Sequence, residues 1–240
     1  MKICLLGYGK MGKAIETIAT KRGHACKYIN SNTNPSEMVE ILDWSEIAIE
    51  FSKPELALKH IEQCSNLKKN IVVGTTGWHD KMNDVKSIVE NSQLGLLYSS
   101  NFSIGVNIFF QINILLARLL NFQPAYSASM EEIHHTQKLD SPSGTAISLS
   151  RQIIENNSKY TQWEESSDLN LGEGILPIHC IREDNVVGTH SVDWKSDIDR
   201  IFIRHEAFNR SGFALGAVVA AEWLLNKSGI FTMNDVLNTK

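Results

Sequence analysis

In the first hundred residues, short apolar strands alternate with amphipathic helices, and this alternation restricts the fold more than any other feature of the chain. Strands are predicted at Ile3–Leu6, Ala25–Ile29, Glu46–Phe51, Ile71–Val73 and Leu94–Tyr98. Helices are predicted between them at Lys13–Lys21, Glu55–Cys64 and Asp80–Glu90. A strand, a helix and a second strand in succession form a right-handed crossover between parallel strands. This part of the chain therefore predicts a Rossmann-like, doubly wound parallel sheet of the α/β class.

The pattern changes after Asn101. A long helix is predicted at Ile104–Leu120, and a turn at residues 121–124 then leads into a strand and a histidine-rich motif. A second helix at Ile147–Ile154 is followed by a polar stretch, Asn156–Gly174, which we interpret as a loop with some irregular helix.

Further along the chain, three strand-like segments follow one another at Leu176–Ile181, Val186–Trp194 and Arg200–Phe208. Because no helical period separates them, they predict an antiparallel meander. The second domain is therefore expected to be α+β, with a mainly antiparallel sheet. An amphipathic helix is predicted at Phe213–Leu225, and Thr232 is expected to cap a short last helix.

The bulk composition excludes several classes of protein. Hydrophobic residues make up 42% of the 240 residues, enough for a sizeable core, and a net charge of -4 without runs of Lys or Arg argues against nucleic acid as a partner. The N-terminal apolar run is too short for a signal peptide, and Ile104–Leu120 is too short and too polar for a membrane span. Scattered cysteines without CxxC spacing fit reduced thiols in a cytoplasmic protein: Cys4, Cys26, Cys64 and Cys180.

The segment KICLLGYGKMGKAI places Gly7, Gly9 and Gly12 in a GxGxxG pattern between a strand and a helix. This arrangement predicts a dinucleotide-binding loop, since glycines let a pyrophosphate approach the amides of a helix N-terminus. A turn that needs glycine only for tight packing is the alternative. Asn30 and Ser31 stand where an acid usually holds the adenosine ribose, so nothing in the sequence decides between NADH and NADPH.

Two later loops follow predicted parallel strands. The sequence GTTG spans Gly74–Gly77, and SSNF spans Ser99–Phe102. Open parallel sheets bind ligands at the carboxyl ends of their strands, so both loops are expected to contact the nicotinamide end of the cofactor. Ordinary turn chemistry is the alternative for each loop.

Residues 130–146 read MEEIHHTQKLDSPSGTA and bring together groups suited to proton transfer and anion binding. The adjacent side chains of His134 and His135 would face opposite ways on a strand, and Lys138 follows in a loop. Gly144 and Thr145 open a predicted helix, whose first amides are suited to a carboxylate. Hydride transfer to an electrophilic carbon requires a proton, which a histidine or the lysine can supply. A metal site or an exposed surface turn are the alternatives, although adjacent histidines seldom chelate one ion.

The stretch EIHHTQKLDSPSGTA closely resembles the signature of the 4-hydroxy-tetrahydrodipicolinate reductase family, also called dihydrodipicolinate reductase. The segments GYGKMG, VVGTTGW, YSSNFSIGVN, VVGTHSV, HEAFNRSGFALGA and FTMNDVL also occur in that family's order. The resemblance implies a cytoplasmic, NADH- or NADPH-dependent reductase of a cyclic dicarboxylate in diaminopimelate and lysine biosynthesis. It also implies a homotetramer whose substrate-domain sheets pack together.

The resemblance further implies domains and residue roles. Residues 1–103 and 211–240 would bind the dinucleotide, and residues 104–210 would bind substrate and form the oligomer. His134 matches the proton donor/acceptor histidine and Lys138 the proton-donating lysine. The substrate-binding positions match His135, Gly144 and Thr145. The cofactor-binding positions match Gly7, Tyr8, Gly9, Lys10, Met11, Gly12, Gly74, Thr75, Thr76, Ser99, Ser100, Asn101 and Phe102.

The chain departs from the family pattern in two places. Many relatives have an acidic residue, often followed by Arg, where this chain has Asn30 and Ser31, and Ser141 replaces a frequent Ala. No metal is expected, and Arg210 is given no role.

Overall fold

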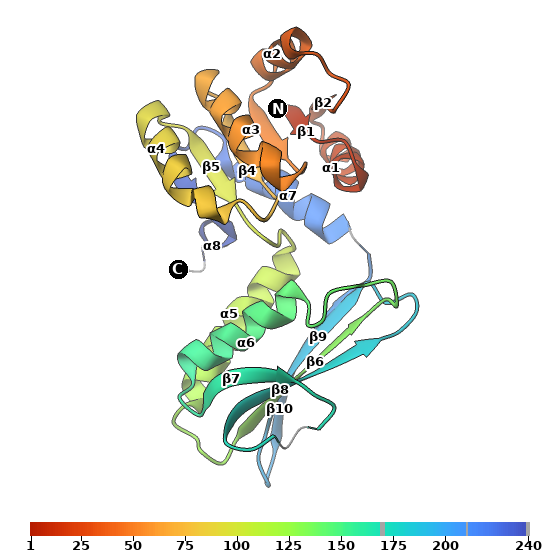
Figure 1. Cartoon of the computed structure of the whole chain (residues 1–240), viewed down its shortest axis with the longest axis vertical. Helices are drawn as coiled ribbons and strands as arrows, with labels where there is room; N and C mark the ends of the chain where they lie inside the picture. The colour runs from red at the N-terminus through yellow and green to blue at the C-terminus, as the bar shows by residue number, and fades with distance from the viewer. Residues whose placement is uncertain (169–170, 210, 239–240) are drawn as a thin grey trace. The chain divides into compact units, whose positions relative to one another are not determined.

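The computed structural model describes residues 1–168, 171–209 and 211–238, and Arg210 lies outside the described residues. The chain divides into two compact units, drawn in Figure 1. Unit 1 comprises Met1–Ile104 and Ser211–Lys240, and unit 2 comprises Gly105–Arg210. None of the helices in the described part of the chain combines the length and the apolar character needed to cross a bilayer.

Unit 1 contains a six-stranded sheet in the order β11-β5-β4-β3-β1-β2, with every pairing parallel. Its strands are β1 (Lys2–Leu6), β2 (Ala25–Ile29), β3 (Ile47–Glu50), β4 (Asn70–Val73), β5 (Gly95–Tyr98) and β11 (Gly229–Phe231). The prediction of a doubly wound parallel sheet is confirmed. The sequence did not reveal β11, because three residues carry too little periodic signal.

Helices cover both faces of this sheet (Figure 1). Side chains alternate along β1, so that Ile3 and Leu5 pack against one set of helices while Cys4 and Leu6 pack against the other. The first set is α1 (Lys10–Lys21), α7 (Ser211–Leu224) and α8 (Met233–Val236). The second set is α2 (Pro35–Trp44), α3 (Pro54–Asn66) and α4 (Met82–Ser92), the last preceded by a 3-10 turn at His79–Lys81.

Two helices of unit 1 differ from the prediction. Helix α2 was not predicted, since only Ile41 and Leu42 are buried in it, although Asn34 caps it by accepting a 2.9 Å hydrogen bond from Glu37 N–H. Helix α7 was predicted to be amphipathic, whereas residues on most sides of it are buried. The small side chains of α7 let it lie close to both α1 and the sheet, so it needs no polar face. Thr232 caps α8 as predicted, and its N–H donates to Asp235 Oδ2 at 2.8 Å.

Unit 2 contains a five-stranded sheet in the order β10-β9-β6-β8-β7. Its strands are β6 (Ser127–His134), β7 (Tyr160–Glu165), β8 (Gly174–Arg182), β9 (Gly188–Lys195) and β10 (Arg200–Ala207). The sheet is mixed rather than mainly antiparallel, since β6 and β8, like β7 and β8, are parallel. The predicted meander is wrong because β6 lies between β8 and β9 and pairs with both. Every second residue of β6 is buried, which suits a central strand.

The predicted loop at Asn156–Gly174 is also wrong in part, because it contains β7. Tyr160 is buried and Trp163 packs against the core of unit 2, while the residues between and after them are exposed. As an edge strand with one buried side, β7 is polar enough to read as a loop.

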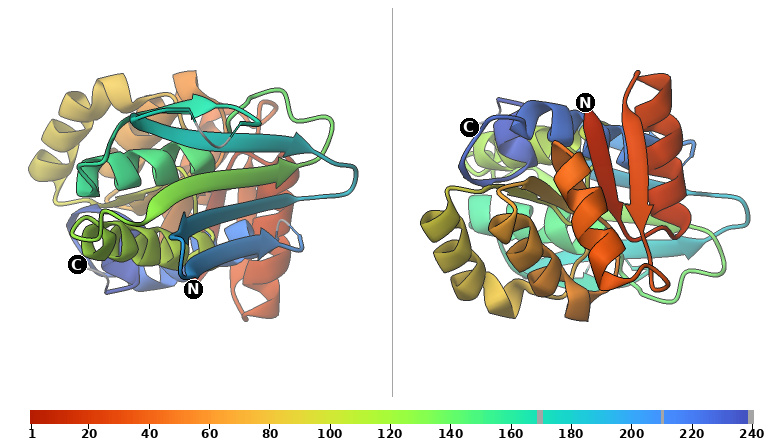
Figure 2. Two further views of the ribbon diagram at one scale, coloured as in Figure 1. Left: turned by 90° about the horizontal axis from the view of Figure 1, so that it is seen from below. Right: turned by 90° about the horizontal axis from the view of Figure 1, so that it is seen from above.

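Two helices, α5 (Ile104–Leu120) and α6 (Gly144–Asn156), cover one face of the five-stranded sheet. In the left-hand view of Figure 2 the strands face the viewer and these helices lie behind them. The core between the layers includes Phe109, Leu149 and the fully buried Trp194. The buried amide of Asn113 donates to Leu149 O at 3.1 Å, which ties α5 to α6.

The close packing of α7 leads to a prediction about stability. A Cβ atom on Gly216 would lie 1.7 Å from the backbone oxygen of Phe102, so Gly216→Ala should lower the free energy of unfolding by about 1–3 kcal/mol. Gly212→Ala is the matched control in the same helix, because its Cβ would approach Ser103 Oγ only to 3.8 Å. Urea unfolding should show the control within about 1 kcal/mol of the wild type. A Gly216→Ala protein as stable as the control would contradict this account of the packing.

Candidate functional site

In unit 1 the three glycines of the GxGxxG pattern have different surroundings. Gly7 has a positive φ of 98°, and a Cβ there would lie 2.3 Å from Phe51 O. A Cβ on Gly12 would lie 2.4 Å from Gly7 O, whereas one on Gly9 would meet nothing within 4 Å. Gly7 and Gly12 are therefore required by packing. Gly9 leaves open space at the N-terminus of α1, which suits a pyrophosphate.

The predicted loops lie at the carboxyl ends of neighbouring strands. Gly74–Thr76 follows β4 and Ser99–Phe102 follows β5, and Ser99 N–H donates to Val73 O at 3.2 Å. Gly9, Lys10, Thr76 and Ser100 are exposed at this edge, while Tyr8, Met11, Gly74, Thr75, Ser99 and Asn101 are half-buried. The side chain of Phe102 is 2% exposed and packs in the core of unit 1, so only its backbone is suited to contact a ligand.

A further loop belongs to this edge and was not identified from the sequence. Residues 51–53 follow β3, and Ser52 N–H donates to Thr75 Oγ1 at 2.9 Å. The same N–H donates to the fully buried carboxylate of Glu50 at 3.0 Å. The signal was present, because FSKP directly follows a buried strand that ends at the same edge.

After β2, Asn30 and Ser31, which stand where an acidic residue is usual, belong to a hydrogen-bonded turn. The side chain of Asn30 accepts a hydrogen bond from Asn32 N–H at 2.9 Å, and Asn30 N–H donates to Thr33 Oγ1 at 3.1 Å. Tyr8 stacks on Tyr28 with ring centroids 3.8 Å apart, and its hydroxyl donates to Glu16. The residues of this turn are neutral. No carboxylate among them would therefore repel an adenosine ribose, whether or not it carries an extra phosphate.

In unit 2 the predicted histidines lie at the end of β6. His134 is 7% exposed and points toward the α5 and α6 side, whereas His135 is half-buried and begins the loop. Lys138 N–H donates to His135 O at 3.0 Å, which closes a turn. Lys138 Nζ lies 2.7 Å from both carboxylate oxygens of Asp140, and this hydrogen-bonded ion pair lowers the pKa of Asp140.

The N-terminus of α6 is held by its capping residue. Ser143 Oγ accepts a hydrogen bond from Ala146 N–H at 3.2 Å, and it lies 3.0 Å from His190 Nε2. A Cβ on the exposed Gly144 would meet nothing within 4 Å, so the first turn of α6 borders open space. Thr145 is half-buried in the same turn. This arrangement suits a substrate carboxylate.

A buried polar cluster that the sequence analysis missed lies behind these residues. The fully buried Glu132 accepts hydrogen bonds from Ser143 N–H at 2.9 Å and from Arg182 Nη1 at 3.2 Å. Glu132 Oε1 lies 3.7 Å from His134 Nδ1, and the ring of His190 lies edge-on to that of His134 at 5.0 Å. The alternation of β6 could have placed Glu132 and His134 on one face, but nothing local identified His190 or Arg182 as neighbours.

Burial and charge have different effects within this cluster. Burial by itself would raise the pKa of Glu132, but His134 and the hydrogen bonds from Ser143 outweigh it and lower the pKa to about 2. Burial, followed by the charge of a protonated His134, lowers the pKa of His190 to about 3. Near neutral pH the cluster therefore combines an ionised carboxylate with a neutral His190.

A metal ion would find ligand atoms in the same cluster. Glu132, His134 and His190 each offer one atom, and these atoms lie within 4.8 Å of one another. Each carboxylate oxygen, however, already accepts a hydrogen bond. Ser143 and Arg182 therefore hold the Glu132 carboxylate in place, so its position does not by itself require an ion.

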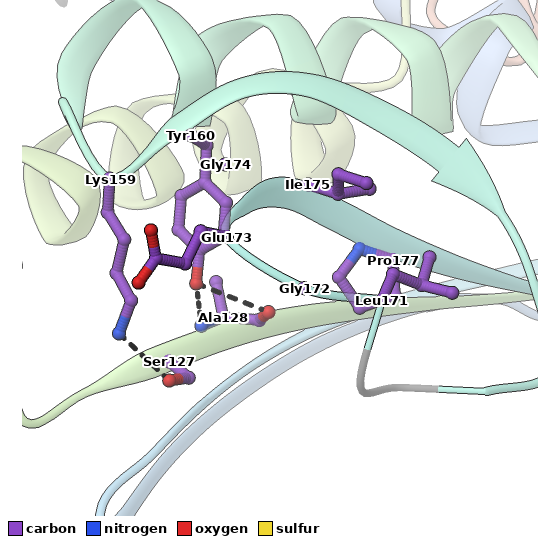
Figure 3. A pocket seen from close by; sticks show the side chains of 10 residues that line it. All are labelled: Ser127, Ala128, Lys159, Tyr160, Leu171, Gly172, Glu173, Gly174, Ile175 and Pro177. Atoms are coloured by element: carbon purple, nitrogen blue, oxygen red, sulfur yellow. Dashed lines mark hydrogen bonds between the residues drawn. The ribbon is translucent and has the colours of Figure 1, made fainter.

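A cavity of about 640 Å³ lies at the other end of the five-stranded sheet (Figure 3). Ser127, the first residue of β6, borders it, whereas His134 is the last residue of that strand. Lys159 at its rim donates to Pro124 O, Tyr126 O and Ser127 Oγ, so its charged group is already engaged. The described residues that line this cavity include Lys159 and Glu173 but no histidine.

Comparison with known proteins assigns both halves of the chain. The model for the N-terminus of dihydrodipicolinate reductase matches residues 1–102, and the model for its C-terminus matches residues 105–237. A 4-hydroxy-tetrahydrodipicolinate reductase from Christiangramia forsetii is 48% identical over 240 residues, covering 99% of this chain and 98% of the relative. One from Neisseria meningitidis is 32% identical, covering 92% and 83%. A dipicolinate-bound dihydrodipicolinate reductase from Paenisporosarcina has a TM-score of 0.76 at 20% identity, covering 97% of both chains, and so shares the fold.

The lowered pKa of His190 predicts a loss of stability in acid. The unfolded state binds a proton near the ordinary histidine pKa of about 6.5, whereas the folded state resists protonation down to about pH 3, so stability falls as the pH drops through this interval. His190→Asn should reduce the slope of the free energy of unfolding against pH by up to about 1.4 kcal/mol per pH unit. Urea unfolding at several pH values between about 7 and 5 measures it. Parallel curves for the wild type and the variant would contradict the assignment.

Proposed function

Because the chain belongs to the dihydrodipicolinate reductase family of oxidoreductases, we propose that it reduces 4-hydroxy-tetrahydrodipicolinate to tetrahydrodipicolinate. A hydride would reach the ring carbon that loses its hydroxyl, and a proton would let that hydroxyl leave as water. One observation carries the proposal: residues 134–145 present an imidazole, an ammonium group and a helix N-terminus in one short segment. These are the groups that reduction of an anionic cyclic substrate requires.

The cofactor of this reaction is proposed to be NADH or NADPH, which supplies the hydride when bound. The open space at Gly9 and the exposed loops after β4 and β5 suit a dinucleotide. The residues proposed to hold it are Gly7, Tyr8, Gly9, Lys10, Met11, Gly12, Gly74, Thr75, Thr76, Ser99, Ser100, Asn101 and Phe102. Asn30 and Ser31 bring neither a repelling nor an attracting charge to an adenosine phosphate, so both cofactors are candidates.

The proton is proposed to come from Lys138 or His134. The ammonium group of Lys138 is paired with the exposed Asp140 in the ligand-free chain, and a dianionic substrate would compete for it. His134 stands beside the buried carboxylate of Glu132, with its Nδ1 3.7 Å from Oε1.

The substrate carboxylates are proposed to bind at the start of α6. Gly144 and Thr145 are its first two residues, and the helix is 13 residues long, so its dipole favours an anion there. His135 lies at the beginning of the same loop and would contact the second carboxylate or the ring. The reaction would belong to diaminopimelate and lysine biosynthesis in the cytoplasm.

The test is to mix the protein with freshly generated substrate and either NADH or NADPH while following nicotinamide absorbance. The wild type should oxidise at least one cofactor only when substrate is present. Lys138→Ala should lower kcat by roughly 10²–10⁴-fold, the usual contribution of a positioned acid. Lys86→Ala, which removes an exposed lysine on α4, is the matched control and should leave the rate unchanged.

Two outcomes would count against the proposal. Failure of both cofactors with this substrate, while a different substrate is reduced, would reassign the activity. Full activity in Lys138→Ala would remove this lysine from the proton-transfer step.

The chain is also proposed to form a homotetramer through the face of the five-stranded sheet opposite α5 and α6. Phe202 on that face is 45% exposed, and Ile133 and Ile181 lie opposite each other in register. Light scattering should give four times the chain mass of 26.9 kDa, and Phe202→Glu should reduce the mass by placing a charge in the contact. A wild type that scatters as a monomer would refute the tetramer.

A further inference from the structure

Glu132 is a fully buried carboxylate with contacts to three parts of unit 2. It lies on β6 and accepts hydrogen bonds from Ser143 at the cap of α6 and from Arg182 on β8. It also faces the ring of His134. We propose that Glu132 is a positioning residue, which fixes the tautomer of the His134 imidazole and the orientation of the first turn of α6 at the same time. The kinetic part of this inference rests on the proposed function, and the structural part does not.

The first step is that the carboxylate is ionised. Arg182 contributes a positive charge at 3.2 Å, and Ser143 N–H donates from the positive end of a helix dipole. His134 and the hydrogen bonds from Ser143 outweigh the cost of burial and lower the pKa of Glu132 to about 2. An ionised carboxylate has acceptors only, so each group that faces it must donate.

The second step is the proton on the His134 ring. His134 Nδ1 is buried and has no hydrogen-bond partner within the described residues, and Glu132 Oε1 lies 3.7 Å away. The carboxylate therefore favours a proton on Nδ1, which leaves the lone pair of a neutral ring on Nε2. The other titratable groups around the cluster are His190, edge-on at 5.0 Å, Lys138 and Asp140 in the loop, Cys180 on β8 and His205 on β10. In a serine protease triad a carboxylate hydrogen-bonded to Nδ1–H selects the histidine tautomer, and Glu132 faces the same ring nitrogen of His134 at the longer distance of 3.7 Å.

The third step is that the same carboxylate holds the helix. Ser143 N–H donates to Glu132 Oε2 at 2.9 Å, while Ser143 Oγ caps Ala146 N–H and contacts His190 Nε2. The imidazole and the first turn of α6 therefore share one anchor. A shift of about 0.5 Å at such an anchor is enough to disturb a reactive geometry, and here it would displace both groups together.

The test begins with ¹⁵N NMR of the histidine rings in the ligand-free protein, with the His134 signals assigned by their loss in His134→Gln. The wild type should carry the neutral-ring proton of His134 on Nδ1. Glu132→Gln should shift the population toward the Nε2–H tautomer, because an amide can donate as well as accept. Glu155→Gln removes a charge from an exposed position on α6 and should leave the spectrum unchanged. An Nε2–H tautomer in the wild type would overturn the proposal, even if Glu132→Gln did not fold.

Kinetics give the second readout. Glu132→Gln should lower kcat by roughly 10²–10⁴-fold, as expected when the orienting partner of an acid or base is lost, with KM for the cofactor unchanged. Glu132→Asp keeps the charge but draws it back by one methylene, so it should retain the wild-type tautomer and an intermediate kcat. An active wild type with full kcat in Glu132→Gln would refute the positioning role and leave the proposed function intact. A wild type without reductase activity would refute the proposed function, while the tautomer result would stand.

Discussion

The packing of two phenylalanines holds together the loops at the carboxyl ends of the strands in unit 1. The ring of Phe51 fills the space where a Cβ on Gly74 would lie, and its carbonyl oxygen lies against Gly7. Its ring centroid is 5.7 Å from that of Phe102, whose own carbonyl oxygen rests against Gly216 on α7. The loops after β1, β3, β4 and β5 are therefore fixed by one continuous set of contacts that extends to α7. Because close-packed interiors transmit small displacements, glycines far apart in sequence set the spacing of these loops together.

Unit 2 surrounds Glu132 with buried polar side chains, whereas the loops of unit 1 rest mainly on the packing of Phe51 and Phe102. Burying the Glu132 carboxylate costs free energy unless the carboxylate is hydrogen-bonded, and here Arg182 and Ser143 supply those hydrogen bonds while His190 remains neutral. A buried polar cluster stabilises a fold less than an apolar cluster of the same volume. Its hydrogen bonds, however, fix the orientation of the side chains, since each bond has a preferred angle. That property suits a place where an imidazole and a helix N-terminus must keep one relative orientation.

The two units carry different chemical groups. The strand-end loops of unit 1 present backbone amides, hydroxyls and open space, without a titratable group among Gly74–Thr76 or Ser99–Phe102. Residues 134–140 of unit 2 carry the imidazole and ammonium groups. This division fits a reaction in which a bound dinucleotide contributes the hydride and the protein contributes only proton transfer and orientation.

The sequence separation over which each interaction acts determines whether it could be predicted from the sequence. The alternation of strands and helices, the GxGxxG loop and the motif from His134 to Thr145 are local patterns, so the parallel sheet and the proposed site residues were available from the chain alone. The neighbours of those residues were not, because strand order depends on which surfaces can be buried together. Tertiary structure placed β8 beside β6 rather than β9 and made an edge strand of a polar segment. It also brought His190 and Arg182 to Glu132, contacts that span about fifty residues of sequence and leave no local periodicity.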